Sequence, residues 1–540
     1  MRTRSPLRHI AIGITSLVVL ALGSATADTV RGSVKLGGVP NSGVIVTARD
    51  TNSGIETSVF TAADGAYRID GLTSGTYTVT AKASGWVAGV VEAGLMSGTA
   101  AVHDFSLTPD PDFAQTLSSA TWLALLPAGD MRREFILNCA SCHEVSAARI
   151  LRNGQPRSAQ DWREAIALMR SIDAYGLTPP DFDDEAYAFW LAEHLDSDAI
   201  ATLTPAPLAS GAVLRARITE FPVPLSPSLP HDLVLGPDGR VWITAFYNDV
   251  VWALTPDTGA IQSYVVNENT DVMGQVRALA FDASGQLWVL LGGTESLVRL
   301  NPQDGSIETF AVGMYPHSIE IDSHGKLWFN DYISAGEKVG TIDPSTRELQ
   351  IFDLPSAGLT KQQGLPLLYG IQIDESNVLW GTMLAANKIF RFDTRTHDAE
   401  LYDMPTPNSG PRRPGMAPDG SLWIPEFNIG SVARFDPASK SYTRHELGLA
   451  TMGPYDTAVD PNSGHVWSAA SLGSAMIRID PATGHRDTYP FPTEPAYPRH
   501  IAIDEVSGDV WTTYSSMPDA VPKIVRIEIH DPDRNQMRPQ

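Results

Sequence analysis

The chain has 540 residues, which is too many for one hydrophobic core, so about three domains are expected. Its 44 glycines, 39 prolines and 19% charged residues favour a turn-rich β protein and exclude disordered, collagen-like and coiled-coil chains. The formal net charge of −23 excludes nucleic acid as a partner, because phosphate backbones repel an acidic surface.

The first 27 residues have the pattern of a secretory signal peptide. Three arginines precede an apolar run of 14 residues over 10–23, and small residues at 25–27 form a cleavage site. The run is shorter than the ~20 residues that a spanning helix needs. We therefore expect a signal peptide over 1–27 and a soluble periplasmic protein with no membrane span after cleavage, with an uncleaved anchor as the alternative.

Residues 29–108 are predicted to form an all-β sandwich. Short alternating segments are separated by D-G and S-G turns, and the string D-G-x-Y-x-I-x-G-L-x-x-G-x-Y-x-V occupies 64–79. This string resembles the carboxypeptidase regulatory-like domain, which implies a transthyretin-type sandwich that serves as a spacer or docking module.

Residues 112–204 are predicted to form a small all-α domain. One helix is expected to begin with Asp130 as its cap and to lead to Cys139. A second begins at a near capping box over 158–161, and a third covers about 185–195. Proline-rich stretches at 109–111 and 205–207 bound the segment.

The sequence C-A-S-C-H over 139–143 predicts covalent attachment of one haem c. Cys139 and Cys142 can each add to a vinyl group of the same haem, and His143 then presents its imidazole to the iron. A redox dithiol would require a βαβ setting, and zinc would require further ligands nearby. With the closing helix over 188–192, the segment resembles a class I cytochrome c domain.

The distal ligand of the iron is predicted to be Met169, the only methionine between Met131 and Met273. Met169 also fits the apolar stripe of its helix, where methionine is ordinary core filler. His194 and an open sixth position are the alternatives.

From about residue 210 to 528 the sequence repeats, which predicts a seven-bladed β-propeller. Seven tryptophans follow D-G-like turns at spacings of 40–52 residues, and each unit reads as four short strands. The seventh unit lacks its fourth strand, which we expect residues 218–222 to supply, closing the ring.

One position of the repeat predicts a ring of polar side chains around the channel mouth. It lies eleven residues before each Trp, or twelve in the sixth blade, where the turn is longer. Loops favour Gly, Ser, Asn and Asp, none of which occurs there, so we interpret the ring as a substrate-binding site. Its members are His231, Arg277, His317, Tyr369, Arg412, Tyr455 and His500.

A second position, three residues after Trp, is expected on the same face and includes Asp331 and Glu426. A longer loop over 356–366 is expected there too, as a lid or a docking surface for the haem segment.

The pattern P-D-G-x-L-W-x-x-E over 418–426 resembles the virginiamycin B lyase family. That resemblance implies a seven-bladed propeller that opens a cyclic ester by elimination, with a general-base His and a Mg²⁺ held by glutamates. The blade that keeps Glu426 has Arg412 in place of the His and Gly410 in place of the first Glu. An arginine cannot act as a base near neutral pH. His317 with Asp331 is the nearest substitute pair.

The expected function is haem-mediated electron transfer, coupled to binding or oxidation of a small molecule or partner at the mouth. A periplasmic electron donor or acceptor is the expected partner, and one haem c is the expected cofactor rather than Mg²⁺. The first alternative is a carbon–oxygen lyase or hydrolase that uses His317, Asp331 and Glu426, and the second is a non-catalytic binding or assembly module. Whether the protein is an enzyme stays open between them.

Overall fold

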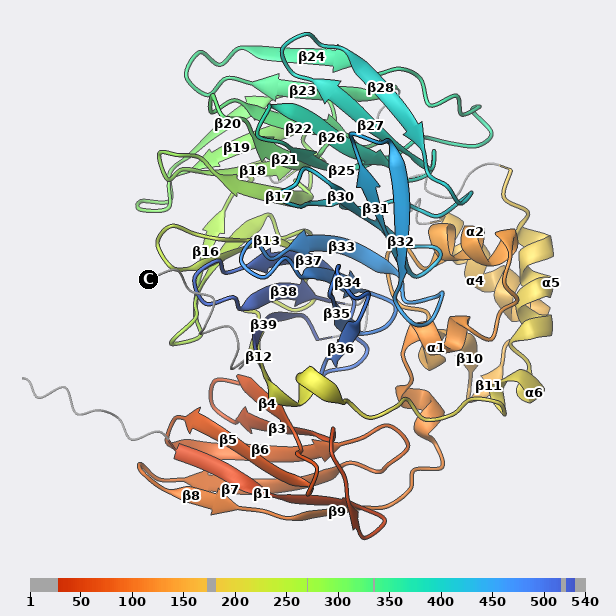
Figure 1. Cartoon of the computed structure of the whole chain (residues 1–540), viewed down its shortest axis with the longest axis vertical. Helices are drawn as coiled ribbons and strands as arrows, with labels where there is room; N and C mark the ends of the chain where they lie inside the picture. The colour runs from red at the N-terminus through yellow and green to blue at the C-terminus, as the bar shows by residue number, and fades with distance from the viewer. Residues whose placement is uncertain (1–27, 172–180, 270, 334–335, 516–520, 530–540) are drawn as a thin grey trace, which may run out of the picture.

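The computed structural model describes residues 28–171, 181–269, 271–333, 336–515 and 521–529. The predicted signal peptide over 1–27 lies outside these residues. Within them, no helix is both long and apolar enough to cross a membrane. Figure 1 shows a β-sandwich at one end, a large β-propeller, and a group of helices against one side of the propeller.

The sandwich packs two sheets around a core of alternating residues that includes Val30, Val46, Ile69 and Val79. One sheet has the order β4 (Glu56–Phe60), β3 (Ile45–Asp50), β6 (Gly75–Lys82) and β7 (Gly89–Leu95). The other is centred on β1 (Asp28–Leu36), which pairs with β2 (Val39–Pro40), β5 (Ala66–Leu72), β8 (Ala100–Val102) and β9 (Phe105–Leu107). The predicted sandwich is confirmed.

The segment after the sandwich is helical, apart from the short hairpin of β10 (Leu151–Arg152) and β11 (Gln155–Pro156). Its helices are η1 (Phe113–Thr116), α1 (Ser119–Leu123), α2 (Asp130–Cys139), α3 (Ala147–Ile150), α4 (Ala159–Ser171), α5 (Asp184–His194) and α6 (Ser197–Ile200). A further short helix, η2 (Gly211–Arg215), leads into the propeller.

Two predicted helix starts have different outcomes. The capping box is confirmed, because the Ser158 amide donates to the Asp161 carboxylate and the Asp161 amide donates to Ser158 Oγ, at 2.9 and 3.2 Å. The cap assigned to Asp130 is wrong. Asp130 is the first residue of α2, after Gly129, and its carboxylate pairs with Arg133 one turn along the helix.

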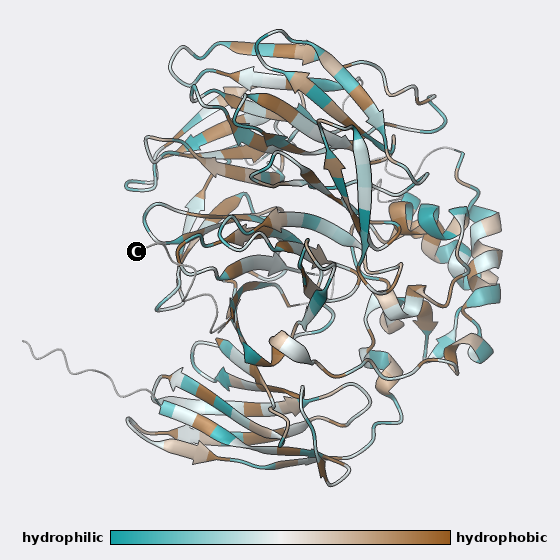
Figure 2. Ribbon diagram, viewed as in Figure 1, coloured by the Kyte–Doolittle hydropathy of each residue, from teal (hydrophilic) through white to brown (hydrophobic). Residues whose placement is uncertain are grey.

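The predicted small all-α domain is helical, but its apolar core is shared with the propeller. Trp122, Phe135 and Leu191 from the helices belong to the same apolar cluster as Phe427 and Leu472 of the propeller. The helical segment therefore buries its apolar side against the propeller. Figure 2 shows the hydrophobic and hydrophilic bands along these helices.

Among the described residues, the propeller has seven antiparallel blades of four strands each: six are separate sheets, and the seventh is part of a larger sheet. The first three blades are β13 (Pro230–Leu235), β14 (Val241–Ala245), β15 (Val250–Thr255) and β16 (Ala260–Val265); β17 (Val276–Phe281), β18 (Leu287–Leu291), β19 (Ser296–Leu300) and β20 (Ile307–Ala311); and β21 (Pro316–Ile321), β22 (Leu327–Asp331), β23 (Lys338–Ile342) and β24 (Leu349–Asp353).

The next three blades have the same strand order. They are β25 (Leu368–Ile373), β26 (Val378–Met383), β27 (Lys388–Asp393) and β28 (Ala399–Asp403); β29 (Gly415–Met416), β30 (Leu422–Glu426), β31 (Ser431–Asp436) and β32 (Ser441–Glu446); and β33 (Pro454–Val459), β34 (Val466–Ala470), β35 (Ala475–Ile479) and β36 (Arg486–Pro490).

The seventh blade contains β37 (Pro498–Ile503), β38 (Val510–Tyr514), β39 (Lys523–Ile529) and, from the start of the propeller, β12 (Ala216–Pro222). The predicted closure is confirmed, because Ile218 lies opposite Ile527 in the β12–β39 ladder. The inner strand β13 contacts both β17 and β37, so the blades form a closed ring. The repeated tryptophans lie on the second strands and are buried.

An edge contact that the sequence analysis did not anticipate joins the sandwich to the propeller. The free side of β12 pairs antiparallel with β4, with Thr219 opposite Thr57. The seventh blade and one sandwich sheet therefore form one eight-stranded sheet. In Figure 1, β12 and β4 lie at the junction between the two modules. The sandwich thus covers an edge that ring closure alone would leave exposed.

Candidate functional site

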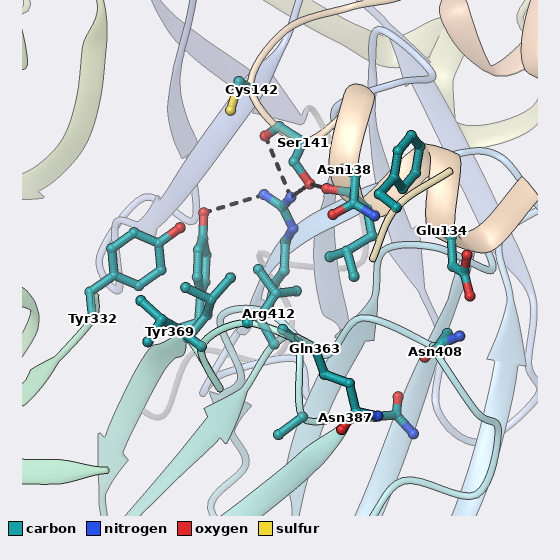
Figure 3. Close-up of a pocket in the computed structure, with 18 of the residues that line it drawn as sticks. Glu134, Asn138, Ser141, Cys142, Tyr332, Gln363, Tyr369, Asn387, Asn408 and Arg412 are labelled. Carbon is teal, nitrogen blue, oxygen red and sulfur yellow. Dashed lines mark hydrogen bonds between the residues drawn. The ribbon is translucent and has the colours of Figure 1, made fainter. Parts of the chain in front are cut away.

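The C-x-x-C-H pentad lies over the mouth of the propeller's axial channel, where α2 ends. Cys139 is the last residue of α2, and Phe135 and Ile136 anchor that helix in the shared core. Figure 3 shows Ser141 and Cys142, just beyond the helix, beside Arg412 of the propeller.

Three propeller side chains donate hydrogen bonds to the pentad. Arg412 Nη2 reaches Ser141 Oγ at 2.7 Å, and Arg499 Nη2 reaches the Cys142 carbonyl at 2.8 Å. The Tyr497 hydroxyl lies 2.9 Å and 2.8 Å from the carbonyl oxygens of Ala140 and Ser141. Tyr497 and Arg499 thus meet carbonyls just beyond the C-terminus of α2, and the negative end of the helix dipole favours the two guanidinium groups.

A second contact fixes the start of the helical segment to the sixth blade. The Ala120 amide donates to the Leu472 carbonyl at 2.7 Å, and Thr451 Oγ1 donates to the Ala120 carbonyl at 2.6 Å. Ser119 in turn accepts from the Val145 amide at 2.9 Å, just after the pentad. The pentad is therefore held from the propeller side and from within its own segment.

The two cysteines are not bonded to each other. Burial raises the pKa of Cys139 to about 12 and also raises the pKa of Cys142. Reactive dithiols have lowered pKa values and often lie at a helix N-terminus, whereas Cys139 ends a helix. Among the described residues, no cluster of three or more His, Cys, Asp or Glu side chains could hold a metal ion. The arrangement therefore favours neither a redox dithiol nor a zinc site.

The His143 side chain has the tautomer that a haem ligand needs. Its Nδ1 lies 2.8 Å from the Glu144 carbonyl oxygen, which can only accept, so Nδ1 carries the proton and Nε2 keeps its lone pair. Burial lowers the pKa of His143 to about 4, which keeps the ring neutral at physiological pH. Two unbonded thiols and one neutral imidazole with a free lone pair fit haem c attachment.

A cavity of about 650 Å³ lies between the helical segment and the propeller mouth. Cys142, Phe182 and Tyr187 line it from the helical side. Leu359 and Gln363 of the 356–366 loop also line it, so the prediction that this loop lies on the ring face is confirmed. The volume is typical of small-molecule sites.

Most of the predicted ring residues do meet at this mouth. His231, Arg277, Tyr369, Arg412 and Tyr455 line the cavity and are buried. His317 lies beside them, with its ring centroid 4.5 Å from that of Tyr369, but is not a lining residue. Whether the cavity binds a substrate stays a prediction.

His500 is wrong as a ring member, and Arg499 takes its place. Four of the predicted ring residues, His231, His317, Arg412 and Tyr455, directly follow a proline, and in the seventh blade the equivalent proline is Pro498. The turn over 504–509 is one residue longer than the equivalent turn over 282–286, so counting back eleven from Trp511 misses by one. His500 instead lies beneath the mouth, with its Nε2 4.0 Å from Asp456 Oδ2.

Neither proposed distal ligand lines the cavity. The Met169 side chain is 38% exposed near the end of α4, and His194 at the end of α5 packs against Trp190. Of the pentad, Ser141 and Cys142 line the cavity. The structure therefore does not place Met169 or His194 beside Cys142 in this cavity.

The acids predicted for a lyase centre make other contacts. The repeat position three residues after Trp, which includes them, does not line the cavity. The Glu426 carboxylate is fully buried and accepts from Arg444 Nε and Nη2 at 2.6 and 2.9 Å and from Ser431. Asp331 Oδ1 accepts from the Tyr315 amide at 3.2 Å. In the first, third and fourth blades the residue four after Trp lines the cavity instead, as Phe246, Tyr332 and Leu384, because adjacent side chains on a strand point to opposite faces.

His317 is poorly suited to act as the general base. Its Nδ1 donates to the Tyr369 carbonyl at 2.7 Å, and Nε2 has no partner among the described residues. Burial and the nearby Arg277 and Arg413 guanidinium groups hold its pKa well below the usual range. The lyase arrangement of His, Glu and metal is therefore not assembled around His317, Asp331 and Glu426.

Sequence reasoning missed Tyr332, Phe246, Tyr497 and Arg499. The first two lie four residues after Trp, one position beyond the one chosen, and line the cavity. Aligning Pro498 of the seventh blade with Pro230, Pro316 and Pro454 would have found Arg499. Tyr497 precedes Pro498, as Tyr315 precedes Pro316 in the third blade.

Residues 29–108 match the family model of the carboxypeptidase regulatory-like domain. That assignment covers the predicted sandwich and confirms it. No curated protein is significantly similar to the chain in sequence.

Many solved structures are similar to the propeller region, and two lyases are among them. One is a catalytically inactive virginiamycin B lyase from Staphylococcus aureus with quinupristin, with 21% identity, 58% of this chain and 99% of that chain covered, and a TM-score of 0.50. The other is a streptogramin B lyase, with 21% identity, coverage of 59% and 100%, and a TM-score of 0.52. At this identity the similarity establishes the propeller fold alone.

Proposed function

We propose that this protein is an exported c-type cytochrome whose haem-bearing segment is mounted over a ligand cavity in the propeller. In this proposal electrons pass between a molecule or partner at the cavity and a periplasmic donor or acceptor. The observation that carries it is the position of the pentad: Cys142 lines the cavity, Tyr497 and Arg499 hold the pentad backbone there, and Arg412 holds the Ser141 hydroxyl.

Cys139 and Cys142 would hold the haem through thioether bonds, and His143 Nε2 would ligate its iron. Each thiol adds across a vinyl group, so attachment needs no net oxidant. The haem, when bound, supplies one-electron redox chemistry. The Glu144 carbonyl holds the His143 proton on Nδ1, which orients the ring. The distal ligand is left open.

The surroundings support a role in electron transfer. The 356–366 loop lines the cavity, and the shared core packs beside it. The net charge of −23 would attract a basic carrier from a distance. A small molecule in the cavity would lie next to Cys142, with no layer of protein between them.

The test is expression of the full chain with its export and haem-maturation systems, followed by a reduced haem spectrum and intact mass. We expect one covalent haem in the wild type, a markedly lower yield of haem protein for Cys142→Ala, and reoxidation of the reduced protein by added acceptors. Colourless protein with no added haem mass would overturn the proposal and favour the non-catalytic binding module.

Axial ligation is tested on the same preparation. His143→Ala should alter the axial-ligand bands of the spectrum, whereas Met169→Ala and His194→Ala should leave them unchanged if neither residue is the distal ligand. If the spectrum of Met169→Ala becomes high-spin, Met169 is the distal ligand. If the spectrum of His194→Ala becomes high-spin, His194 is the distal ligand.

A further inference from the structure

Two neighbouring arginines at the channel mouth have opposite electrostatic surroundings. Arg413 is buried and neutralised, because its Nη1 donates to Asp232 Oδ2 at 2.6 Å. Arg412 is only 1% exposed, and no carboxylate of the described residues lies within ion-pair distance of it. Its Nη atoms reach only the Tyr369 hydroxyl and Ser141, and its Nε has no partner in the described part of the chain.

Aromatic rings hold the Arg412 guanidinium in place. Its Cζ lies 3.8 Å from the ring centroid of Phe427, 4.4 Å from that of Tyr455 and 5.2 Å from that of Tyr369. Such stacking stabilises a buried cation in part but does not neutralise it. The fork is therefore oriented in advance and keeps its charge.

Two more buried arginines line the same cavity. Arg277 donates to the Tyr315 hydroxyl at 2.9 Å and lies 3.2 Å from His231 Nε2, and Arg499 donates to the carbonyls of Ser515 and Cys142. These hydroxyl, imidazole and carbonyl groups are uncharged. Arg412 has no counter-charge among the described residues, and burying such a cation is costly unless a ligand supplies the negative charge.

The acids that line the cavity belong to its helical rim. The Glu134 carboxylate accepts from the Tyr187 hydroxyl at 2.7 Å, and Asp183 caps α5 at the Ala186 amide. Asp181 and Asp183 are exposed. The propeller end of the cavity is therefore cationic, and Phe246, Tyr332 and Leu367 give it flat and apolar walls.

We propose that this cavity binds a carboxylate attached to a flat, apolar body, with the Arg412 fork as the main contact and Arg277 and Arg499 as supporting cations. Guanidinium and carboxylate match geometrically and bond in pairs. The carboxylate could come from a free aromatic acid, or from the propionates of the haem, in which case the inference rests on the proposed function.

The experiment measures binding of benzoate and 2-naphthoate to the full-length mature protein by calorimetry, with benzyl alcohol and 2-naphthylmethanol as neutral probes. For a free acid, we expect a carboxylate to bind more tightly than its alcohol, and Arg412→Gln to weaken it by about tenfold or more. Arg434→Gln is the control, because it removes the same charge from the fifth blade at a place where Arg434 pairs with Asp419. We expect it to leave the affinity for the acids unchanged.

The haem-propionate source gives a different result. The haem-loaded protein would then not bind the acids, the haem-free Cys139→Ala/Cys142→Ala protein would bind them, and Arg412→Gln would lower the midpoint potential relative to Arg434→Gln. Arg412→Lys keeps the charge and loses the fork, so its acid affinity and midpoint potential should lie between those of the wild type and Arg412→Gln. If Arg412→Gln does not fold, Arg412→Lys is used in its place.

The inference is overturned if the alcohols bind as well as the acids. It is also overturned if neither protein form binds an acid through Arg412 and the potential is unchanged. A protein that carries no haem yet binds 2-naphthoate through Arg412 would overturn the proposed function and support this inference.

Discussion

The sandwich and the helical segment are attached to the propeller by different kinds of contact. The sandwich is joined by a main-chain ladder between β4 and β12, on the outer edge of the seventh blade. The helical segment is joined at the channel mouth mainly by side-chain donors: Tyr497 and Arg499 reach backbone carbonyls, and Arg412 reaches the Ser141 hydroxyl.

The difference teaches what each attachment can do. A ladder depends on backbone groups that every residue except proline carries, so it gives a firm junction with little chemical consequence. Side-chain donors depend on particular residues at particular positions, and they bring Cys142 and the guanidinium groups to one cavity. Function is therefore expected at the second attachment, and stability mainly from the first.

Breaking the ladder should have the largest effect. Thr57 lies in β4 between its partners Ala48 and Thr219, so Thr57→Pro removes a ladder hydrogen bond in the middle of the eight-stranded sheet. We expect a loss of about 3 kcal/mol or more in the free energy of unfolding, measured by denaturant titration. Thr57→Ala keeps the N–H and is the control. Equal losses in both variants would show that the side chain, and not the ladder, matters.

A pH titration sharpens the comparison at the same junction. Glu220 of β12 lies opposite Glu56 and is fully buried, and burial raises its pKa to about 7. The folded state therefore keeps a proton that the unfolded state releases above about pH 4.3, so stability from this group is full below pH 4.3 and is lost as pH rises to 7.

Glu220→Gln should remove that dependence. We expect the variant to gain stability relative to the wild type by about 1 kcal/mol per pH unit between pH 5 and 7, measured by urea unfolding at each pH. Parallel pH profiles of the two proteins would contradict the assignment.

The smallest effect is expected at the mouth. Tyr497→Phe removes the hydroxyl shared by two pentad carbonyls and should cost about 1 kcal/mol, felt locally. Amide exchange over 137–145 should become about fivefold faster while the rest of the chain is unchanged. Tyr442→Phe is the matched control, because the buried Tyr442 hydroxyl has no partner among the described residues. Equal changes in both variants would refute a specific role for Tyr497.

The repeats made much of the fold predictable. Trp after a D-G-like turn identified seven blades, and the incomplete seventh unit indicated which strand closes the ring. The ring members were found wherever blade lengths agree, as at His231 and Arg412. The count failed at His500, because one extra turn residue shifts the register and sends the next side chain to the opposite face.

The sequence by itself determined the local features of this protein: a sandwich, a helical segment with a C-x-x-C-H pentad, and a seven-fold repeat, all written in short-range spacing. Only the tertiary structure decided that β12 continues into the sandwich sheet and that the pentad lies over Arg412. These contacts join residues more than 150 positions apart, and such contacts depend on the shapes and unpaired groups of folded surfaces.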